Sequence, residues 1–290
     1  MFHFVVVAMH PVARVTFVCT QPAVMKSLLY ICSLLGALSG AAQPAAKAFT
    51  ERTDSGFALY ANNPEWYPVT MLFTLDNTNL RFSEGNKLQF VVPPKSERFR
   101  IGSFVPARTD AAFRVKYNYR TCMGDVRARP KDTVYLLPFT KGESFLLYQG
   151  YNGTFSHGGE QSIDFTMPEG TVVRAIRGGT VVEVVQQNNR QCSEPDCKKY
   201  NNYVIILHSD GTFAYYAHIR QSGAQVKPGD SVQAGDAIAY SGNVGYTNGP
   251  HLHFSVLSGG FDKWTTWPTK FKTEKGVQLL REGEQYTRNY

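Results

Sequence analysis

Two histidines lie one residue apart in the segment NGPHLHF, at positions 251 and 253. Side chains at i and i+2 of a β-strand point to the same face of a sheet. His251 and His253 would then share one face, while Leu252 and Phe254 continue along the opposite, buried face. Two imidazoles on one face can bind a metal ion, but the same pattern also fits two ordinary side chains on a wet surface.

The other histidines favour the metal. Five of the seven lie between positions 157 and 253, and none lies between 49 and 156. Apart from the pair, these are His157 in a glycine-rich loop, His218 in AYYAHI, and His208 in ILHSDG. The position of His208 at a strand end beside a turn predicts a surface or turn residue.

An aspartate interrupts an apolar strand pattern in SIDF, where Ile163 and Phe165 would face the core. Asp is a poor strand former, so its presence in a strand requires a specific explanation. The side chain of Asp164 would project to the face opposite that of Ile163 and Phe165. Two histidines and one carboxylate form a catalytic zinc set, which leaves a fourth position for water. A hydrogen-bonded turn at Asp164 is the alternative.

The region that carries these residues is predicted to be a β domain over 136–262. GTVVRAIRGGTVVEVVQQ (170–187) predicts two strands joined by a Gly-Gly turn, and NYVIILHSDGTFAYYAHI (202–219) predicts a hairpin around residues 209–211. Gly-Asp recurs at 229–230 and 235–236, where glycine is expected to serve backbone geometry.

The preceding residues, 49–135, alternate apolar and polar residues in short bursts separated by turn formers. This pattern predicts a small β-sandwich, interpreted as an accessory domain for binding, spacing or folding. Residues 263–290 are interpreted as a solvated C-terminal extension with an aromatic anchor. The predicted fold class is thus mostly β.

Residues 1–48 are interpreted as a presequence with a signal peptide, with Met25 as the interpreted start. From Met25 a lysine, an apolar run of residues 28–42 and small residues follow one another, as in a signal peptide. That run is shorter than the roughly 20 residues that span a bilayer, so no stable transmembrane span is expected after cleavage. The sequence predicts export to the periplasm or cell envelope, and an uncleaved anchor is the alternative.

Charge and cysteines agree with an exported protein. Three of the 30 Lys and Arg residues and none of the 23 Asp and Glu residues precede position 49, which leaves +4 on the mature part. This weak positive charge suits an acidic cell wall, and no nucleic-acid motif accompanies it. Of Cys122, Cys192 and Cys197, the last two are predicted to form a disulfide, although three thiols allow three pairings.

The ordered motifs SHGGEQSIDFTMPEGTVVRAIRGGTVVEV, AYYAHI and VKPGDSVQAGDAIAYSGNVGYTNGPHLHF resemble the lysostaphin/LytM-type zinc metallopeptidases, over roughly residues 150–260. The resemblance implies a LytM-like antiparallel β-sheet domain and one Zn²⁺ per chain. It also implies hydrolysis of peptide bonds in the peptide stems and cross-links of bacterial peptidoglycan.

The resemblance implies a role for each residue of the site. His157, Asp164 and His253 would bind the zinc, and His218 and His251 would act beside it. The commonest family spacing is His-x3-Asp, whereas six residues separate the two ligands here. The additional residues must loop outward, which Gly158 and Gly159 permit.

The chemistry follows from these residue types. Zinc lowers the pKa of a bound water to about 7 and polarises the scissile carbonyl. His251 is assigned to orienting the water or accepting its proton, and His218 to stabilising the transition state, although the sequence allows the reverse. No HExxH motif is present, which excludes a thermolysin-like helix.

Two other functions are weighed against this one. A catalytically dead relative that binds cell wall or activates a partner amidase would typically lack one or more zinc ligands, and here all three ligands and both helper histidines are present. A cupin-like barrel also uses a His-x-His pair but needs a Glu shortly after it, which HLHFSVLSGG lacks. The sequence therefore predicts an exported zinc endopeptidase.

Overall fold

A computed structural model describes residues 13–18 and 43–290, and only strand positions are described for residues 13–18. The chain divides into two compact units, Met1–Cys122 and Met123–Tyr290, called here the first unit and the second unit. The sequence predicted a boundary at 135. The structure differs because residues 134–135 form a strand that pairs with Lys270–Thr273 in the second unit.

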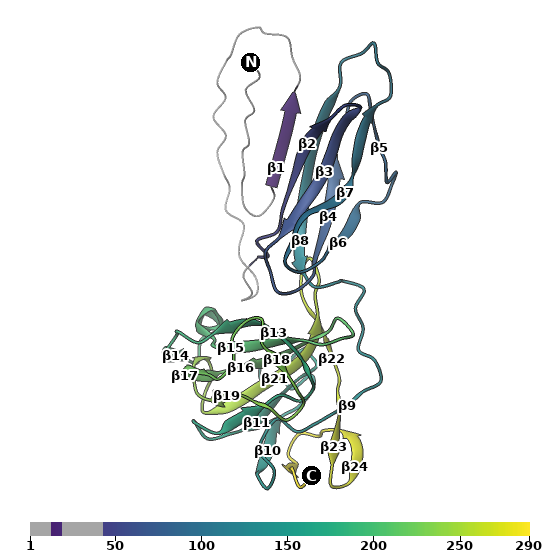
Figure 1. The fold of residues 1–290 in the computed structure, drawn as a ribbon. Coiled ribbons are helices and arrows are strands. Elements are labelled where there is room, and N and C mark those ends of the chain that lie inside the picture. The colour runs from purple at the N-terminus through teal and green to yellow at the C-terminus, as the bar shows by residue number, and fades with distance from the viewer. Residues whose placement is uncertain (1–12, 19–42) are drawn as a thin grey trace. The chain divides into compact units, whose positions relative to one another are not determined.

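The first unit contains two four-stranded antiparallel sheets (Figure 1). One has the order β1-β8-β4-β6 and the other the order β2-β3-β7-β5. The strands are β1 (Ala13–Val18), β2 (Lys47–Thr53), β3 (Gly56–Asn63), β4 (Val69–Leu75), β5 (Leu80–Phe82), β6 (Gln89–Val92), β7 (Ser96–Pro106) and β8 (Arg114–Met123).

These two sheets pack face to face, which confirms the predicted sandwich. Phe82 of one sheet meets Phe90 of the other with ring centroids 6.4 Å apart. The backbone N–H of Ala48 donates to the hydroxyl of Tyr119 across the same interface at 3.2 Å. Because Ala46 and Ala48 are buried, the sandwich begins slightly before the predicted residue 49. The predicted signal segment, residues 25–42, lies outside the described residues.

The second unit is built on a nine-stranded sheet of order β18-β13-β15-β16-β21-β11-β10-β25, with β22 paired to β21. Its strands are β10 (Ser144–Gln149), β11 (Ser162–Thr166), β13 (Gly179–Val185), β15 (Tyr203–Leu207), β16 (Phe213–Ala217), β18 (Ser231–Val232), β21 (His251–Ser258), β22 (Thr265–Trp267) and β25 (Gln285–Thr287). The antiparallel pairing of its central strands confirms the predicted sheet.

Smaller sheets and one short helix complete the second unit. They are β12-β19-β17, β14-β20 and β24-β23-β9, and the 3₁₀ helix η1 (Pro195–Tyr200). Their strands are β9 (Val134–Tyr135), β12 (Val172–Arg174), β14 (Gln191–Cys192), β17 (Ile219–Ala224), β19 (Ala237–Ser241), β20 (Gly245–Tyr246), β23 (Lys270–Thr273) and β24 (Gly276–Leu279). The core between the sheets is aliphatic and aromatic.

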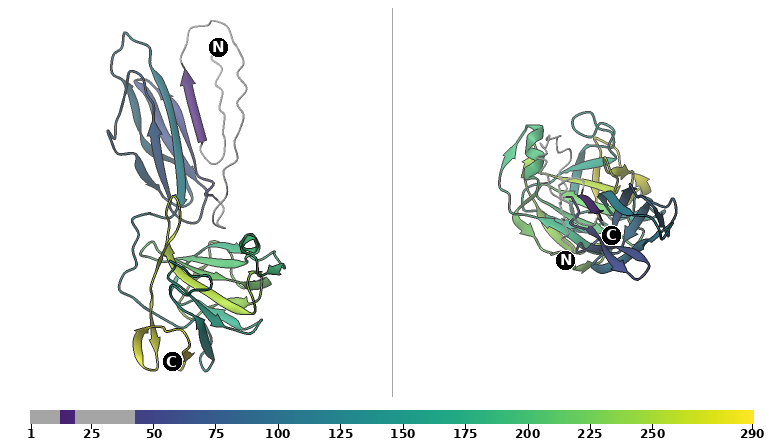
Figure 2. Two further views of the ribbon diagram at one scale, coloured as in Figure 1. Left: turned by 180° about the vertical axis from the view of Figure 1, so that it is seen from behind. Right: turned by 90° about the horizontal axis from the view of Figure 1, so that it is seen from above.

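The C-terminal segment 263–290 is not a solvated extension, which corrects the sequence interpretation. Its strand β25 pairs with β10, so the last residues lie beside β10 in both Figure 1 and Figure 2. Phe271, Leu280 and Tyr286 are buried in the core of the second unit. Apolar residues separated by charged ones concealed this burial in the sequence.

The glycines serve two different purposes. Gly229 and Gly235 of the Gly-Asp repeats have φ of +98° and +96°, a left-handed conformation that suits glycine in tight turns. The Gly-Gly pair does not form a hairpin, because β12 pairs with β19 and not with β13. A Cβ on Gly179 would lie 2.3 Å from the carbonyl oxygen of Leu207, so this glycine permits close approach of β13 and β15.

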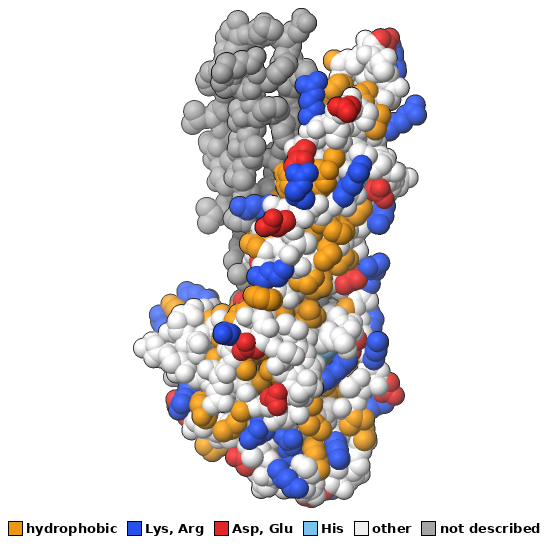
Figure 3. All heavy atoms as spheres, viewed as in Figure 1, with side chains coloured by type: hydrophobic (Ala, Val, Ile, Leu, Met, Phe, Trp, Pro, Cys, Tyr) orange, Lys and Arg blue, Asp and Glu red, His pale blue; other side chains and the backbone are white. Residues whose placement is uncertain are grey.

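Basic and acidic side chains are interspersed over the face of the molecule drawn in Figure 3. This distribution agrees with the weak net charge of the mature part. In residues 13–18 and 43–290, no helix is long and apolar enough to cross a membrane.

Candidate metal centre

Asp164 and His253 are brought together by strand register. Strands β11 and β21 pair antiparallel, and these two residues lie directly opposite each other. Their neighbours Phe165 and Leu252 also form a pair, and both are fully buried. Because side chains alternate along a strand, the acid and the imidazole project together from the other face.

His157 comes from a different kind of element. It lies in the irregular segment 150–161 between β10 and β11, where its backbone N–H donates to the carbonyl of Gly153. After His157 the chain turns outward: Glu160 N–H donates back to the His157 carbonyl, and Gly159 has φ of +76°. Residues 158–160 are exposed. The outward loop expected from the long His-to-Asp spacing is confirmed.

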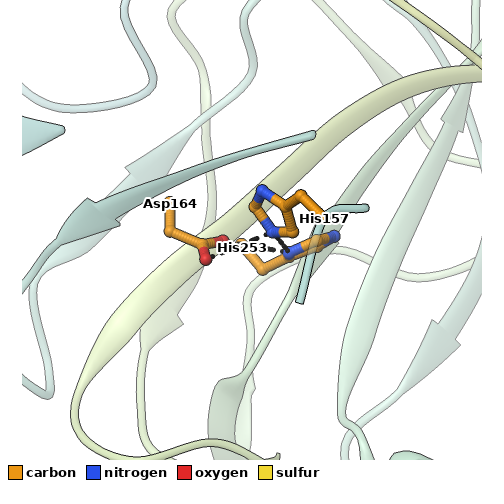
Figure 4. Close-up of side chains that lie close together, drawn as sticks. All are labelled: His157, Asp164 and His253. Atoms are coloured by element: carbon orange, nitrogen blue, oxygen red, sulfur yellow. Dashed lines mark hydrogen bonds and ion pairs between the residues drawn. The ribbon is translucent and has the colours of Figure 1, made fainter. Parts of the chain in front are cut away.

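The three side chains converge (Figure 4). Nε2 of His157 lies 3.2 Å from Oδ2 of Asp164, and Nδ1 of His253 lies 2.9 Å from Oδ1. The two ring nitrogens are 3.2 Å apart. Within residues 43–290, this is the one group of three or more His, Cys, Asp or Glu side chains whose possible ligand atoms all lie within 4.8 Å.

These separations fit a tetrahedral zinc ion. With zinc–nitrogen and zinc–oxygen bonds of about 2.0–2.2 Å, two ligand atoms on a tetrahedron lie about 3.3–3.6 Å apart. The observed separations of 2.9–3.2 Å lie slightly below that range. Two imidazole lone pairs at 3.2 Å repel each other unless a proton or a cation lies between them. The residues present therefore fit a metal ion.

The tautomer of His157 suits this arrangement. Its Nδ1 lies 3.2 Å from the carbonyl oxygen of Gly150, which can only accept a hydrogen bond. Nδ1 therefore carries the proton, and the lone pair of Nε2 faces Asp164 and His253. A backbone carbonyl that fixes the tautomer is typical of a histidine that ligates a metal.

The electrostatics keep the aspartate ionised. Burial alone would raise the pKa of Asp164, but the hydrogen bonds and charges of His157 and His253 hold it well below its ordinary value. Burial opposes protonation of His157, yet contact with Asp164 raises the pKa of that imidazole. The carboxylate is 2% exposed. Its buried negative charge favours a cation in its neighbourhood.

The two predicted helper histidines lie beside this group. His218 follows β16, next to Ala217, which pairs with His253, and His251 begins β21. The ring of His218 lies 4.5 Å from that of His251 and 5.9 Å from that of His253, centroid to centroid. All five predicted site residues thus meet in one place.

Backbone carbonyls fix both helper rings. Nδ1 of His218 donates to the carbonyl of Val244 at 2.9 Å, and Nδ1 of His251 donates to that of Gly249 at 2.8 Å. Each neutral ring then keeps Nε2 as a free acceptor. Burial lowers the pKa of His218 to about 3, helped by the neighbouring imidazoles, and burial also lowers the pKa of His251. Both rings are neutral at pH 7.

The backbone of His218 is unusual. Its φ of +63° lies in the left-handed region, which few non-glycine residues adopt. The chain turns sharply there from β16 to β17, and this turn directs the ring to the Val244 carbonyl. A conformation of this kind costs on the order of 1 kcal/mol and is found preferentially at functional sites.

The loop that supplies these carbonyls is held by residues that flank a disulfide-closed loop. Cys192 and Cys197 are bonded, as predicted, and Cys122 is buried and takes no part in this disulfide. The side chain of Gln191 donates to the Thr247 carbonyl at 2.6 Å, and Tyr246 N–H donates to Asn201 Oδ1 at 3.0 Å. The disulfide thereby supports the segment that orients both helper histidines.

Sequence reasoning missed Tyr148, which reaches the same site. Its ring packs edge-on against His251, with centroids 5.5 Å apart. Burial raises its pKa, and so do the charge of Asp164 and a hydrogen bond to it, so the hydroxyl stays protonated. A β-bulge between Leu147 and Gln149 leaves Tyr148 without a partner in β11 and redirects its side chain. Alternation alone could not predict that bulge.

The structure also places Tyr215, Tyr216 and His208. Tyr216 lies in the core, whereas Tyr215 packs against His253 with centroids 5.9 Å apart, so one of the two tyrosines faces the site. His208 is not a surface residue: it is 2% exposed and its Nδ1 donates to the Gly178 carbonyl at 2.9 Å. It lies at the turn before β16, remote from the site along the strand.

A hollow of about 280 Å³ adjoins Tyr148. Phe155 on its wall is 58% exposed, and its ring stacks with Tyr246 at 6.5 Å. Asn248 also lines it, whereas Asn243 accepts a hydrogen bond from Thr247 within its own turn. The lining residues are Tyr148, Gln149, Thr154, Phe155, Asn248 and Glu282.

Comparison with known proteins identifies this region. Residues 158–263 match the model of peptidase family M23. The chain carries a peptidase family M23 domain. The match includes Asp164, His218, His251 and His253, begins one residue after His157, and stops before most of the C-terminal segment.

The relatives of the M23 domain include endopeptidases. The chain is 32% identical over 148 residues to the glycyl-glycine endopeptidase ALE-1 of Staphylococcus capitis, which covers 50% of this chain and 37% of that protein. It is 36% identical over 97 residues to the peptidoglycan DD-endopeptidase ShyA of Vibrio cholerae, covering 33% and 20%. The chain thus spans about a third or less of these relatives' own lengths.

Among solved structures, the M23 domain is similar to the catalytic domain of lysostaphin from Staphylococcus simulans. The identity is 28%, with 47% of this chain and 87% of that chain covered and a TM-score of 0.31.

Proposed function

We propose that this chain is an exported zinc metalloendopeptidase that hydrolyses peptide cross-links of bacterial peptidoglycan. The observation that carries the proposal is the convergence of His157, Asp164 and His253, with their ligand atoms 2.9–3.2 Å apart, beside His218 and His251. The peptidoglycan substrate is supported by the endopeptidase relatives of the M23 domain.

In this proposal the three converging residues bind one Zn²⁺. A bound zinc ion would supply a Lewis acid that lowers the pKa of a water and polarises a peptide carbonyl. The chain's own groups then handle protons. Because Nδ1 of both His218 and His251 is committed to a carbonyl, each ring offers Nε2 as an acceptor for a proton from the attacking water.

The hydroxyl of Tyr148 is the better candidate for a donor. A neutral His218 carries its only N–H on Nδ1, so it has none for a developing oxyanion. Tyr148 remains protonated and lies beside His251. We therefore assign proton acceptance to the histidine pair and oxyanion stabilisation to Tyr148, in place of His218.

Two further parts of the proposal concern location and domains. The Cys192–Cys197 disulfide supports an oxidising compartment, in agreement with the predicted signal segment. The first unit has no histidine in residues 43–122, which supports an accessory role for it. The complete set of five site residues speaks against a non-catalytic relative that only activates an amidase.

Incubation of the mature protein with purified peptidoglycan tests the proposal. Fragments identified by mass spectrometry should show peptide-bond cleavage, which a chelator abolishes and added Zn²⁺ restores. Full cleavage in the presence of the chelator, or cleavage only of an amide between sugar and peptide, would contradict it.

A further inference from the structure

The C-terminal segment touches the loop that carries His157 at three points. A side-chain oxygen of Glu282, Oε2, accepts a hydrogen bond from the Gly150 N–H at 2.9 Å. The Tyr151 hydroxyl donates to the Thr269 carbonyl at 3.0 Å. At the far end of the loop, Gln161 N–H donates to Thr266 Oγ1 at 2.7 Å.

These contacts hold the first, second and last residues of the irregular segment 150–161. Further bonds dock the C-terminal segment on the strand that precedes this loop. Gly283 N–H donates to the Leu147 carbonyl at 2.8 Å, and Leu147 N–H donates to that of Glu284 at 2.9 Å. The His157 loop is thus anchored at both ends by residues 266–284.

One of the three contacts leads directly to the metal centre. Gly150 receives the Glu282 side chain on its N–H, and its carbonyl accepts the Nδ1 proton of His157 at 3.2 Å. A glycine has no side chain to restrict its φ and ψ, so its carbonyl direction depends on external contacts. Glu282 fixes the plane of the peptide bond that precedes Gly150. The hydrogen bond from Tyr151 to Thr269 fixes the residue that follows Gly150.

The backbone of Gly150 and the side chain of Glu282 lie close together. A Cβ on Gly150 would lie 3.2 Å from Cβ of Glu282, so the glycine allows the acidic residue to reach the backbone. The carbonyl that is held in this way determines which nitrogen of His157 carries the proton. Nε2 is then the nitrogen that faces Asp164 and His253.

We propose that residues 266–284 form a positioning strap for the metal ligand His157, with Glu282 as the positioning residue that acts through Gly150. This inference rests on the proposed function, because it takes His157 as a ligand. It also explains how a ligand with unusually long spacing to Asp164 is held in place: the strap lies entirely outside the family match, as His157 does.

Zinc affinity is the readout that tests the strap. Outer partners of metal ligands typically contribute 10–100-fold in metal affinity. Glu282→Ala should therefore weaken zinc binding at least about tenfold in a competition with a chromophoric chelator. The Co²⁺-loaded variant should show an altered d–d absorption spectrum, and excess zinc should restore its peptidoglycan cleavage.

Two variants serve as controls. Glu282→Gln keeps an oxygen acceptor for the Gly150 N–H and should bind zinc nearly as the wild type does. Glu274→Ala removes an exposed acid from the same segment, away from the loop, and should leave zinc affinity and the Co²⁺ spectrum unchanged. If Glu282→Ala does not fold, Thr266→Val, which removes the acceptor for Gln161, carries the same prediction.

The outcomes separate the two proposals. Wild-type protein that binds no zinc overturns the metal centre and the strap together. Wild-type protein that binds zinc, with Glu282→Ala or its substitute Thr266→Val binding equally well, overturns the strap alone. An equal loss of affinity in Glu274→Ala would also overturn it, since the effect would then come from charge and not from the contact.

Discussion

The two ends of strands β15 and β16 both hold a buried histidine, and the two differ in what surrounds them. His208 follows β15 and His218 follows β16, and because these strands are antiparallel, the two lie at opposite ends of the sheet. Each donates Nδ1–H to a backbone carbonyl at 2.9 Å, and burial lowers the pKa of each. Their local chemistry is therefore nearly the same.

The surroundings decide the role. At the His208 end, Arg177 and Asp210 form an ion pair at 2.5 Å, and Thr212 donates to the same aspartate. Arginine and acid neutralise each other there. At the His218 end, the ring nitrogens of His157 and His253 converge on the carboxylate of Asp164. The charges of Arg177 and Asp210 are paired at the first end, which indicates a structural role, whereas a converging set of ligand atoms at the other end indicates a functional one.

The largest expected effect comes from removing a proposed metal ligand at the His218 end. His253→Ala should abolish stoichiometric zinc binding and reduce peptidoglycan cleavage by about 10³-fold or more, since a metal Lewis acid supplies several kcal/mol. His208→Ala is the matched control and should retain both properties. Zinc content by mass spectrometry and fragment release check this. Equal losses in both variants would remove the distinction between the two ends.

Removing a helper should give a smaller loss of a different kind. His251→Ala should reduce cleavage by about 10²–10⁴-fold, the usual contribution of a general acid or base, while zinc binding is retained. Cleavage rates and a zinc titration of the same sample separate the two effects. Loss of zinc in this variant would make His251 a ligand and contradict its assignment.

At the His208 end, the expected effect is a loss of stability of the fold. Asp210→Ala leaves the half-buried Arg177 without its partner, and removal of one partner of a buried pair costs about 3 kcal/mol. Chemical denaturation should show this loss in the free energy of unfolding. Cleavage by the folded variant should stay at the wild-type level. A large loss of activity at full stability would show that this end contributes to the site.

The smallest expected effect is the contribution of His208 to the pH dependence of the free energy of unfolding. Burial lowers the pKa of His208 from 6.5 to about 4, so the unfolded chain binds the proton more readily between these values. This stabilising contribution is present above pH 6.5 and is lost as the pH falls towards 4. About 2 kcal/mol should disappear between pH 7 and pH 5.

A matched comparison isolates this contribution. His208→Gln should flatten that part of the profile of unfolding free energy against pH, measured on protein without zinc. An unchanged slope in His208→Gln would show that the proton is taken up elsewhere.

The features of the site that lie on β-strands could be predicted from the sequence. The alternation around Asp164 and in the His-x-His pair determines which side chains share a face, and register then brings the acid opposite His253. The clustering of histidines pointed to the right region. These predictions need only the two-residue period of a strand.

Features that depend on long-range contacts could not be predicted in the same way. The orientation of His157 depends on Gly150 and Glu282, which are far apart in the sequence. Tyr148 reaches the site because of a bulge, which no pattern in SFLLYQ indicates. The buried His208 packs against Tyr135, which is far from it in the sequence.

The most direct test of the central claim is anomalous diffraction at the zinc edge from crystals of the zinc-loaded protein. The account predicts one strong peak per chain, within about 2.0–2.2 Å of Nε2 of His157, an oxygen of Asp164 and Nδ1 of His253. A peak held by other residues, or no peak at this position at full zinc loading, would contradict it.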